Sequence, residues 1–215
     1  MAHSFEQLFK QYDWEQVKEK IYSSTSADVQ FVLSKNKRTI SDFLILLSPA
    51  AAPYLEQMAN LSQQLTQQRF GKTIQLYAPL YLSNECQNIC TYCGFSLDNK
   101  IKRKTLSNTE IMLEAMALKA MGVNHVLLVS GEANRTVGVD YFKNAINLLR
   151  SHFTHISIEV QPLSTEEYED LKEAGVHTVL VYQETYHQDV YKAYHPKGKK
   201  SNFEFRLDTP DRIGQ

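Results

Sequence analysis

The sequence is poor in the residues that build disulfide-rich, collagen-like or membrane-spanning chains. Its 215 residues include three cysteines, eight glycines, six prolines and one tryptophan. The longest apolar run, 43–47, is far too short to cross a bilayer, and the polar start of the chain lacks the apolar segment of a secretory signal. Lys and Arg (23) balance Asp and Glu (24), so the basic excess typical of nucleic-acid binding is missing. We therefore expect a cytoplasmic globular protein whose partners are neither membranes nor nucleic acids.

The first seventy residues have the apolar spacing of helices. A short buried helix is expected over 41–47, and a longer one over 50–70 with Gly71 as its C-terminal cap. Residues 1–71 are thus predicted to form a helical N-terminal extension.

After Gly71 the pattern changes to alternating strands and helices. The expected strands are 73–82, 124–129, 156–160 and 178–182. The segments 107–110 and 164–167 have the Ser-x-x-Glu pattern of capping boxes, which open two of the intervening helices. Strand and helix alternating at this interval predict right-handed βαβ units on a parallel sheet, so the fold class is α/β.

The number of strands is small for a closed barrel. A closed (β/α)₈ barrel takes about 250 residues, whereas this part of the chain offers four or five strands and would leave an open parallel edge. We expect residues 72–215 to be the N-terminal part of a larger (β/α) barrel of the TIM-like type.

All three cysteines fall within eight residues, as Cys86, Cys90 and Cys93. An odd number so close together argues against a disulfide framework. Three thiolates on a short loop can bind three irons of a 4Fe–4S cluster and leave the fourth iron open to a substrate or cofactor. A zinc site needs a fourth ligand, and the next histidine, His125, lies far along the chain in a predicted strand. The spacing favours the cluster, with a zinc site or three unrelated thiols as the alternatives.

Polar residues follow three of the predicted strands, at the edge where barrel enzymes assemble their sites. They are Glu132, with Gly131 before it, after the second strand, Glu159 and Gln161 at the end of the third, and Gln183 and Glu184 after the fourth. Because side chains two residues apart on a strand share a face, Glu159 and Gln161 are expected to point into the barrel. A buried carboxylate is unfavourable unless paired, which makes Glu159 a candidate on physical grounds. A basic segment, 197–200, is expected to form a flexible loop over the mouth of this site.

Several segments carry a resemblance to a known family. The pattern C-x3-C-x-Tyr-C after a first strand resembles the signature of radical S-adenosylmethionine enzymes. The flanking sequence is similar to their tyrosine lyase family (2-iminoacetate synthase) of bacterial thiamine biosynthesis. The similar segments are 77–84, 99–106, 127–132, 159–163, 181–187 and 206–212.

The resemblance implies a 4Fe–4S cluster on the three cysteines and S-adenosylmethionine as the second cofactor. It implies cofactor binding by Tyr92, Gly131, Glu132, Gln183 and Glu184. Within this set, Tyr92 is expected to lie against the adenine, and Glu132 to hold the methionyl ammonium in a motif whose first glycine is Ser130 here. Glu159 and Gln183 are the candidate catalytic residues.

The implied reaction begins with reductive cleavage of S-adenosylmethionine. The radical so formed takes a hydrogen from the amino group of L-tyrosine, whose Cα–Cβ bond breaks to give 2-iminoacetate and p-cresol. Thiazole synthase and a flavodoxin-type reductant are the expected protein partners. The alternatives are a tyrosine lyase of the hydrogenase-maturation type, or a truncated, non-catalytic fragment that holds a cluster or zinc and docks a partner.

Overall fold

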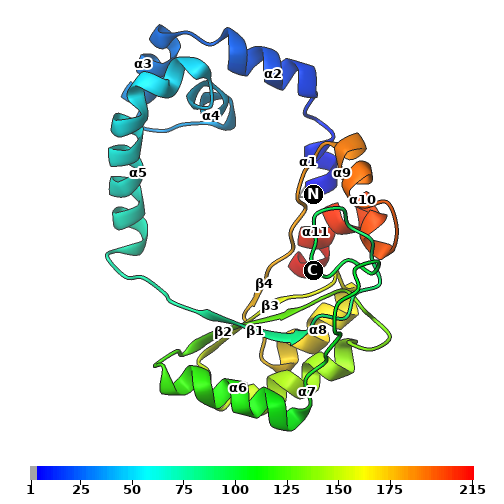
Figure 1. The fold of residues 1–215 in the computed structure, drawn as a ribbon. Coiled ribbons are helices and arrows are strands. Elements are labelled where there is room, and N and C mark those ends of the chain that lie inside the picture. The colour runs from blue at the N-terminus through cyan, green and yellow to red at the C-terminus, as the bar shows by residue number, and fades with distance from the viewer. Residues whose placement is uncertain (1–3) are drawn as a thin grey trace. The chain divides into compact units, whose positions relative to one another are not determined.

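Figure 1 shows the protein as a computed structural model, which describes residues 4–215. The described chain divides into two compact units, 7–74 and 75–215, and residues 4–6 belong to the second. No helix of the described residues is long and apolar enough to cross a membrane.

The N-terminal unit is built from helices. In chain order they are α1 (Phe5–Phe9), whose first two residues belong to the second unit, α2 (Trp14–Ser23), α3 (Ser26–Ser34), α4 (Ile40–Leu46), the 3₁₀ helix η1 (Pro49–Tyr54) and α5 (Leu55–Phe70). Its core is small and consists of Val29, Val32, Leu33, Ile45 and Ala51.

Two details of this unit differ from the sequence prediction. The single helix expected over 50–70 begins at Leu55 instead, because Pro53 has no backbone N–H and the preceding residues form η1. The helix expected over 41–47 is present as α4 but is not a buried helix, since Phe43 is exposed and only Asp42 and Ile45 are buried. Gly71 caps α5 as predicted, with a positive φ of 69°.

The C-terminal unit contains a four-stranded parallel sheet in the order β1-β2-β3-β4. The strands are β1 (Ala78–Ser83), β2 (His125–Ser130), β3 (His155–Glu159) and β4 (Thr178–Val179). Helices α6 (Asn108–Ala120), α7 (Val139–Leu149) and α8 (Thr165–Ala174) connect them and cover one face of the sheet (Figure 1). The core between sheet and helices includes Leu82, Leu128, Ile158, Ile146 and Leu171. The predicted α/β class with a parallel sheet is confirmed.

The outer strands are shorter than the sequence predicts. The strand expected over 73–82 begins at Ala78, where pairing with Val126 starts, and Ile74 and Leu76 before it are about four-fifths exposed. The strand expected over 178–182 has two residues, because β4 pairs only with Ser157 and Ile158 of β3. Apolar residues alone do not make a strand, since the ladder also needs a paired neighbour.

Capping boxes open α6 and α8 where they were predicted. The hydroxyls of Ser107 and Ser164 accept hydrogen bonds from the backbone N–H groups of Glu110 and Glu167. After β4 the chain forms α9 (Gln188–Tyr194), η2 (Lys199–Ser201), α10 (Phe203–Leu207) and α11 (Thr209–Gly214). Of these, α11 packs against α8, and η2 and α10 carry residues of the site described next.

Candidate functional site

The three cysteines lie on the long loop between β1 and α6, at the carboxyl end of the sheet. All three are free thiols; Cys90 is buried, and Cys86 and Cys93 are partly exposed. Burial raises the pKa of the Cys90 thiol to about 11, and Lys200, Cys86 and Cys93 are near enough to change it electrostatically. The other two thiols of the loop thus lie within electrostatic range of Cys90.

Arg103 lies within the same loop and hydrogen-bonds to its backbone. Its guanidinium donates hydrogen bonds to the backbone carbonyls of Asn84 (2.6 Å), Phe95 (2.9 Å) and Ser96 (2.7 Å). A guanidinium suits this task because it presents several donors in a fixed plane. Arg103 thus joins the two ends of the cysteine loop.

A second segment, 194–200, lies along the cysteine loop. Ile89 N–H donates to the carbonyl of Lys197 (2.9 Å), and Thr91 N–H to that of Tyr194 (3.0 Å). Gly198 has φ +101°, and a Cβ there would lie 2.3 Å from Oδ1 of Asn88, so only glycine fits. The basic segment expected to be a flexible loop is instead hydrogen-bonded to the loop that carries the cysteines.

Gly131 brings the end of β2 against the cysteine loop. Its N–H donates to the carbonyl of Ser83 (3.0 Å), and a Cβ on Gly131 would stand 2.2 Å from the carbonyl oxygen of Glu85 and 3.2 Å from Cβ of Cys86. No side chain fits in that space, so the backbone contact requires glycine.

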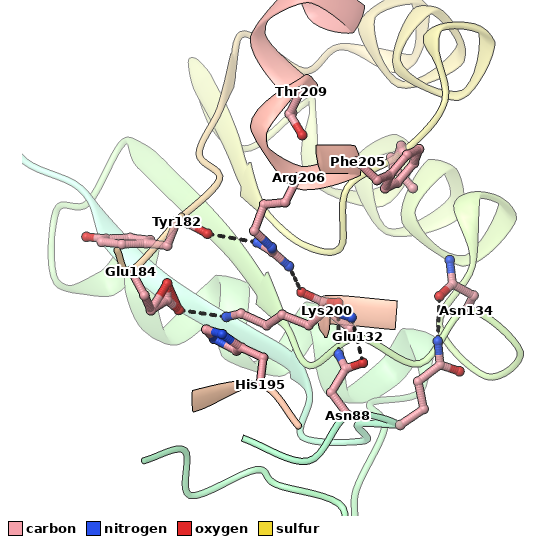
Figure 2. Close-up of polar contacts among 12 residues, drawn as sticks. Asn88, Glu132, Asn134, Tyr182, Glu184, His195, Lys200, Phe205, Arg206 and Thr209 are labelled. Carbon is pink, nitrogen blue, oxygen red and sulfur yellow. Dashed lines mark hydrogen bonds and ion pairs between the residues drawn. The ribbon is translucent and has the colours of Figure 1, made fainter. Parts of the chain in front are cut away.

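Glu132 is fixed by two partners that sequence reasoning missed (Figure 2). Its carboxylate forms an ion pair with Arg206 of α10 and accepts a hydrogen bond from Nδ2 of Asn88 (2.8 Å). Asn88 is fully buried, and its Oδ1 accepts the backbone N–H of Lys200 (3.0 Å). The side chain of Asn88 therefore links the cysteine loop, the end of β2 and the segment before α10.

Tyr92 and Glu184 meet in a second polar group (Figure 2 shows Glu184, Lys200 and His195). The Tyr92 hydroxyl donates to Glu184 (2.7 Å) and lies 2.8 Å from Nε2 of His195, and Lys200 Nζ lies 2.6 Å from Glu184. Burial alone would raise the pKa of Glu184, but the hydrogen bonds from Lys200 and Tyr92 outweigh it and lower the pKa. Glu184 also has a positive φ of 65°, a strained conformation for a residue with a side chain.

Glu159, Gln161 and Gln183 occupy different parts of the site. Burial raises the pKa of Glu159, which also lies within electrostatic range of Lys200 and Glu184. Gln161 is buried and lines a cavity of about 380 Å³ together with Glu132 and Arg206. Gln183 is buried too, and its Nε2 has no hydrogen-bond partner among the described residues 4–215. It lines a different cavity of about 500 Å³ that Arg206 also reaches.

Sequence reasoning gave no role to Asn88, Arg206 and His195, and it expected Lys200 only as part of a basic loop over the site. Asn88 stands between two of the cysteines, which is a signal that could have been used. Arg206 and His195 have no such local signal, because Arg206 contacts Glu132 from 74 residues away in sequence and His195 contacts Tyr92 from 103 residues away.

The donor set, three free thiols on one loop, fits a 4Fe–4S cluster. Within residues 4–215, no three His, Cys, Asp or Glu side chains are grouped as ligands of one metal ion. A cluster does not need that grouping, because each cysteine binds a different iron. The contact between Gly131 and the backbone of Glu85, which a Cβ would block, keeps the loop next to Glu132, where a second cofactor can approach.

Fold and site together define an α/β protein with a cysteine-loop cofactor centre at the carboxyl ends of parallel strands. The chain belongs to the radical SAM superfamily, whose pattern it matches over residues 80–214. The cofactors of this superfamily, a 4Fe–4S cluster and S-adenosylmethionine, are those expected from the sequence.

Curated relatives and solved structures agree with this assignment. The chain is 50% identical over 212 residues to a 2-iminoacetate synthase from Escherichia coli (strain K12), covering 99% of this chain and 56% of that protein. It superposes on HydG, a maturase of the [FeFe]-hydrogenase, with a TM-score of 0.88 at 26% identity, over 94% of this chain and 47% of that one. A methylornithine synthase (PylB) shares the fold at a TM-score of 0.65 and 22% identity, over 93% of this chain and 55% of that one. The chain spans about half the length of the curated relatives it matches.

Proposed function

We propose that the protein is a radical SAM lyase that cleaves the Cα–Cβ bond of L-tyrosine to give 2-iminoacetate and p-cresol for thiazole formation in thiamine biosynthesis. The main support is the 50% identity to a 2-iminoacetate synthase along nearly the whole chain. The observation that carries it is the placement of three free thiols beside Glu132, which two buried partners hold at the end of β2.

In this proposal Cys86, Cys90 and Cys93 hold the cluster. When bound, cluster and S-adenosylmethionine together supply one-electron chemistry that yields a 5′-deoxyadenosyl radical. Arg103 and Gly131 keep the loop in position, and the Glu132 carboxylate binds the methionyl ammonium.

Tyr92, Gln183 and Glu184 complete the cofactor site. Tyr92 offers an aromatic face to the adenine, and Glu184 offers carboxylate oxygens to the ribose hydroxyls. Burial raises the pKa of Glu159, so its carboxyl takes up a proton more readily than an exposed one. We assign Glu159 to proton transfer at the substrate amino group, and Gln183 to binding of the reacting amino acid.

Thiazole synthase is the proposed recipient of 2-iminoacetate, a flavodoxin-type protein the proposed reductant, and the cytoplasm the proposed location. The hydrogenase-maturation type of tyrosine lyase is less favoured, because the identity to HydG is 26% against 50% for the synthase.

Anaerobic reconstitution with iron and sulfide tests this proposal. Low-temperature EPR of the reduced protein, with and without S-adenosylmethionine, should show a 4Fe–4S signal that changes when the cofactor is added. Incubation of the reduced protein with tyrosine should then release p-cresol. A chain that holds zinc, or a cluster that does not respond to the cofactor, would leave the non-catalytic fragment as the better description.

Two variants test the assignment of residues. Cys90→Ala should not retain a cluster of four irons. Glu132→Ala should keep the cluster and weaken the EPR response to S-adenosylmethionine, whereas Glu114→Ala, on the exposed side of α6, should behave as the parent protein. An unchanged response in Glu132→Ala would remove that carboxylate from the cofactor site.

A further inference from the structure

Positive charge is concentrated around the cysteine loop. Residues 84–104 and 192–200 contain eight of the chain's 23 Lys and Arg but only two of its 24 Asp and Glu. The remainder of the chain is therefore clearly acidic, although the whole carries a net charge of only −1. A local field of this sign guides acidic partners toward the surface that carries it.

These two segments are neighbours in the folded chain. The carbonyl of Lys197 accepts the N–H of Ile89, and the carbonyl of Lys102 accepts Nδ2 of Asn84 (2.9 Å). Arg135 and Lys199 line a broad surface depression of about 790 Å³, and Cys86 lies in its wall. The depression thus leads from a basic surface to one of the three cysteines.

Most of the cations on this surface are not used for internal structure. Lys200, Arg103 and Lys104 are committed to Glu184, to backbone carbonyls and to Glu110. The others are exposed, and none of them forms an ion pair within residues 4–215: Lys100, Lys102, Arg135, Lys192, Lys197 and Lys199. We call these six residues the basic rim.

We propose that the basic rim docks an acidic electron-transfer protein, which reduces the cluster from the side of Cys86. This inference rests on the proposed function, because that function requires a one-electron donor. In the step, one electron leaves the reduced cofactor of the donor and enters the cluster, and no bond forms or breaks. Opposite charges on donor and rim would raise the rate of productive encounter, mainly through the association rate.

The test compares reduction of the reconstituted protein by two reductants in stopped-flow absorbance. A reduced flavodoxin serves as the acidic protein donor, and photoreduced deazaflavin as a small donor that needs no docking surface. The variant Lys102→Glu/Lys199→Glu reverses two charges of the rim. Its matched control, Arg150→Glu/Lys172→Glu, reverses two exposed charges at the C-terminal ends of α7 and α8, neither of which forms an ion pair within the described residues.

We expect the rim variant to take electrons from flavodoxin at least about tenfold more slowly at low ionic strength. Its dependence on salt should also be weaker, because fewer opposite charges remain to be screened. Reduction by deazaflavin and the control variant should be unaffected. An unchanged flavodoxin rate in the rim variant would overturn the proposal.

Two further outcomes are informative. If the rim variant keeps its flavodoxin rate but loses affinity for a labelled oligonucleotide, the surface binds nucleic acid and the proposal is wrong. Tyrosine cleavage under deazaflavin reduction tests the proposed function separately. A protein that accepts electrons through the rim but releases no p-cresol would leave the docking inference intact and reject the lyase.

Discussion

At Gly131 the backbone at the end of β2 touches the backbone of the cysteine loop, and no atom can be added between them. Because Gly131 has no side chain, the cysteine loop can lie close to Glu132. Ligand residues are visible in a sequence, whereas a contact that excludes a side chain is visible only in three dimensions.

Gly131→Ala should therefore displace the cysteine loop while the helices remain folded. A Cβ 2.2 Å from the Glu85 carbonyl oxygen cannot be accommodated without moving one of the two backbones. We expect iron content after reconstitution to fall several-fold, measured by iron assay, with unchanged helical circular dichroism. Gly214→Ala, where nothing lies within 4 Å of the added Cβ, is the control. Full iron content in Gly131→Ala would show that the loop can move freely.

His195 holds the Tyr92 hydroxyl in position through a hydrogen bond at its Nε2. It is completely buried, its ring lies 4.0 Å from that of Tyr191, and its Nδ1 is 2.8 Å from the Tyr191 carbonyl, which leaves Nε2 for the Tyr92 hydroxyl. We regard His195 as a positioning residue, because it acts on the cofactor site through Tyr92.

His195→Phe should keep the ring packing and remove the hydrogen bond to Tyr92. We expect iron content to stay the same and the concentration of S-adenosylmethionine needed for the EPR change to rise several-fold. His195→Gln, which can still hydrogen-bond, should recover part of the loss, and His152→Phe is the control elsewhere in the chain. Equal responses in His195→Phe and the parent would mean that Tyr92 needs no such support.

The helix termini are the elements that local sequence determines best. At the start of α4, Asp42 accepts the N–H of Thr39 (2.9 Å) and lies 2.6 Å from Lys35 Nζ. The hydrogen bonds from Lys35 and Thr39 lower the pKa of Asp42 to about 2. All of these partners lie within seven residues of one another, so distant parts of the chain have little influence on them.

The lowered pKa predicts how acid affects the N-terminal unit. In the unfolded chain the pKa of Asp42 is about 3.9. The ionised carboxylate therefore contributes fully to stability above that pH, and its contribution disappears as the pH falls through about 2. Thermal midpoints measured by circular dichroism from neutral pH to about pH 2 should fall less steeply in Asp42→Asn than in the parent. The exposed Asp189→Asn should follow the parent curve, and a parallel acid limb in both variants would contradict this role for Asp42.

Strands behave differently from helix termini. Polar and apolar residues alternate over 73–76, yet residues 73–77 form no strand, because β2 begins too late to pair with them. The two-residue β4 is short for the same kind of reason. The bounds of a strand are set by pairing partners about 20–50 residues away, and periodicity within the segment carries no information about them.

On the scale of the whole molecule, residues 71–77 join the two units. This segment contains no helix or strand, and Ile74, Leu76 and Tyr77 are more than half exposed. An exposed segment without regular structure is where a protease can bind the backbone in extended form.

Limited digestion with chymotrypsin should therefore cut first at Leu76 or Tyr77. Leu55 and Leu113 are similarly exposed but lie in helices, so they should be cut later. Mass spectrometry of early fragments identifies the site. The variant Leu76→Gln/Tyr77→Gln should be cut more slowly, and a first cut within α5 or α6 would contradict the assignment of this segment as the joint.

The sequence by itself determined the fold class, the capping boxes of α6 and α8, and the cysteine spacing, because each depends on residues within one or two helical turns. It also placed Glu132 just after the carboxyl end of β2. The tertiary structure alone decided that Asn88 and Arg206 hold Glu132, that His195 and Lys200 hold Tyr92 and Glu184, and that the segment 194–200 lies along the cysteine loop. Apart from Lys200 and Glu184, which are 16 positions apart, these contacts join residues 44 to 112 positions apart, and only packing of the whole unit brings such residues together.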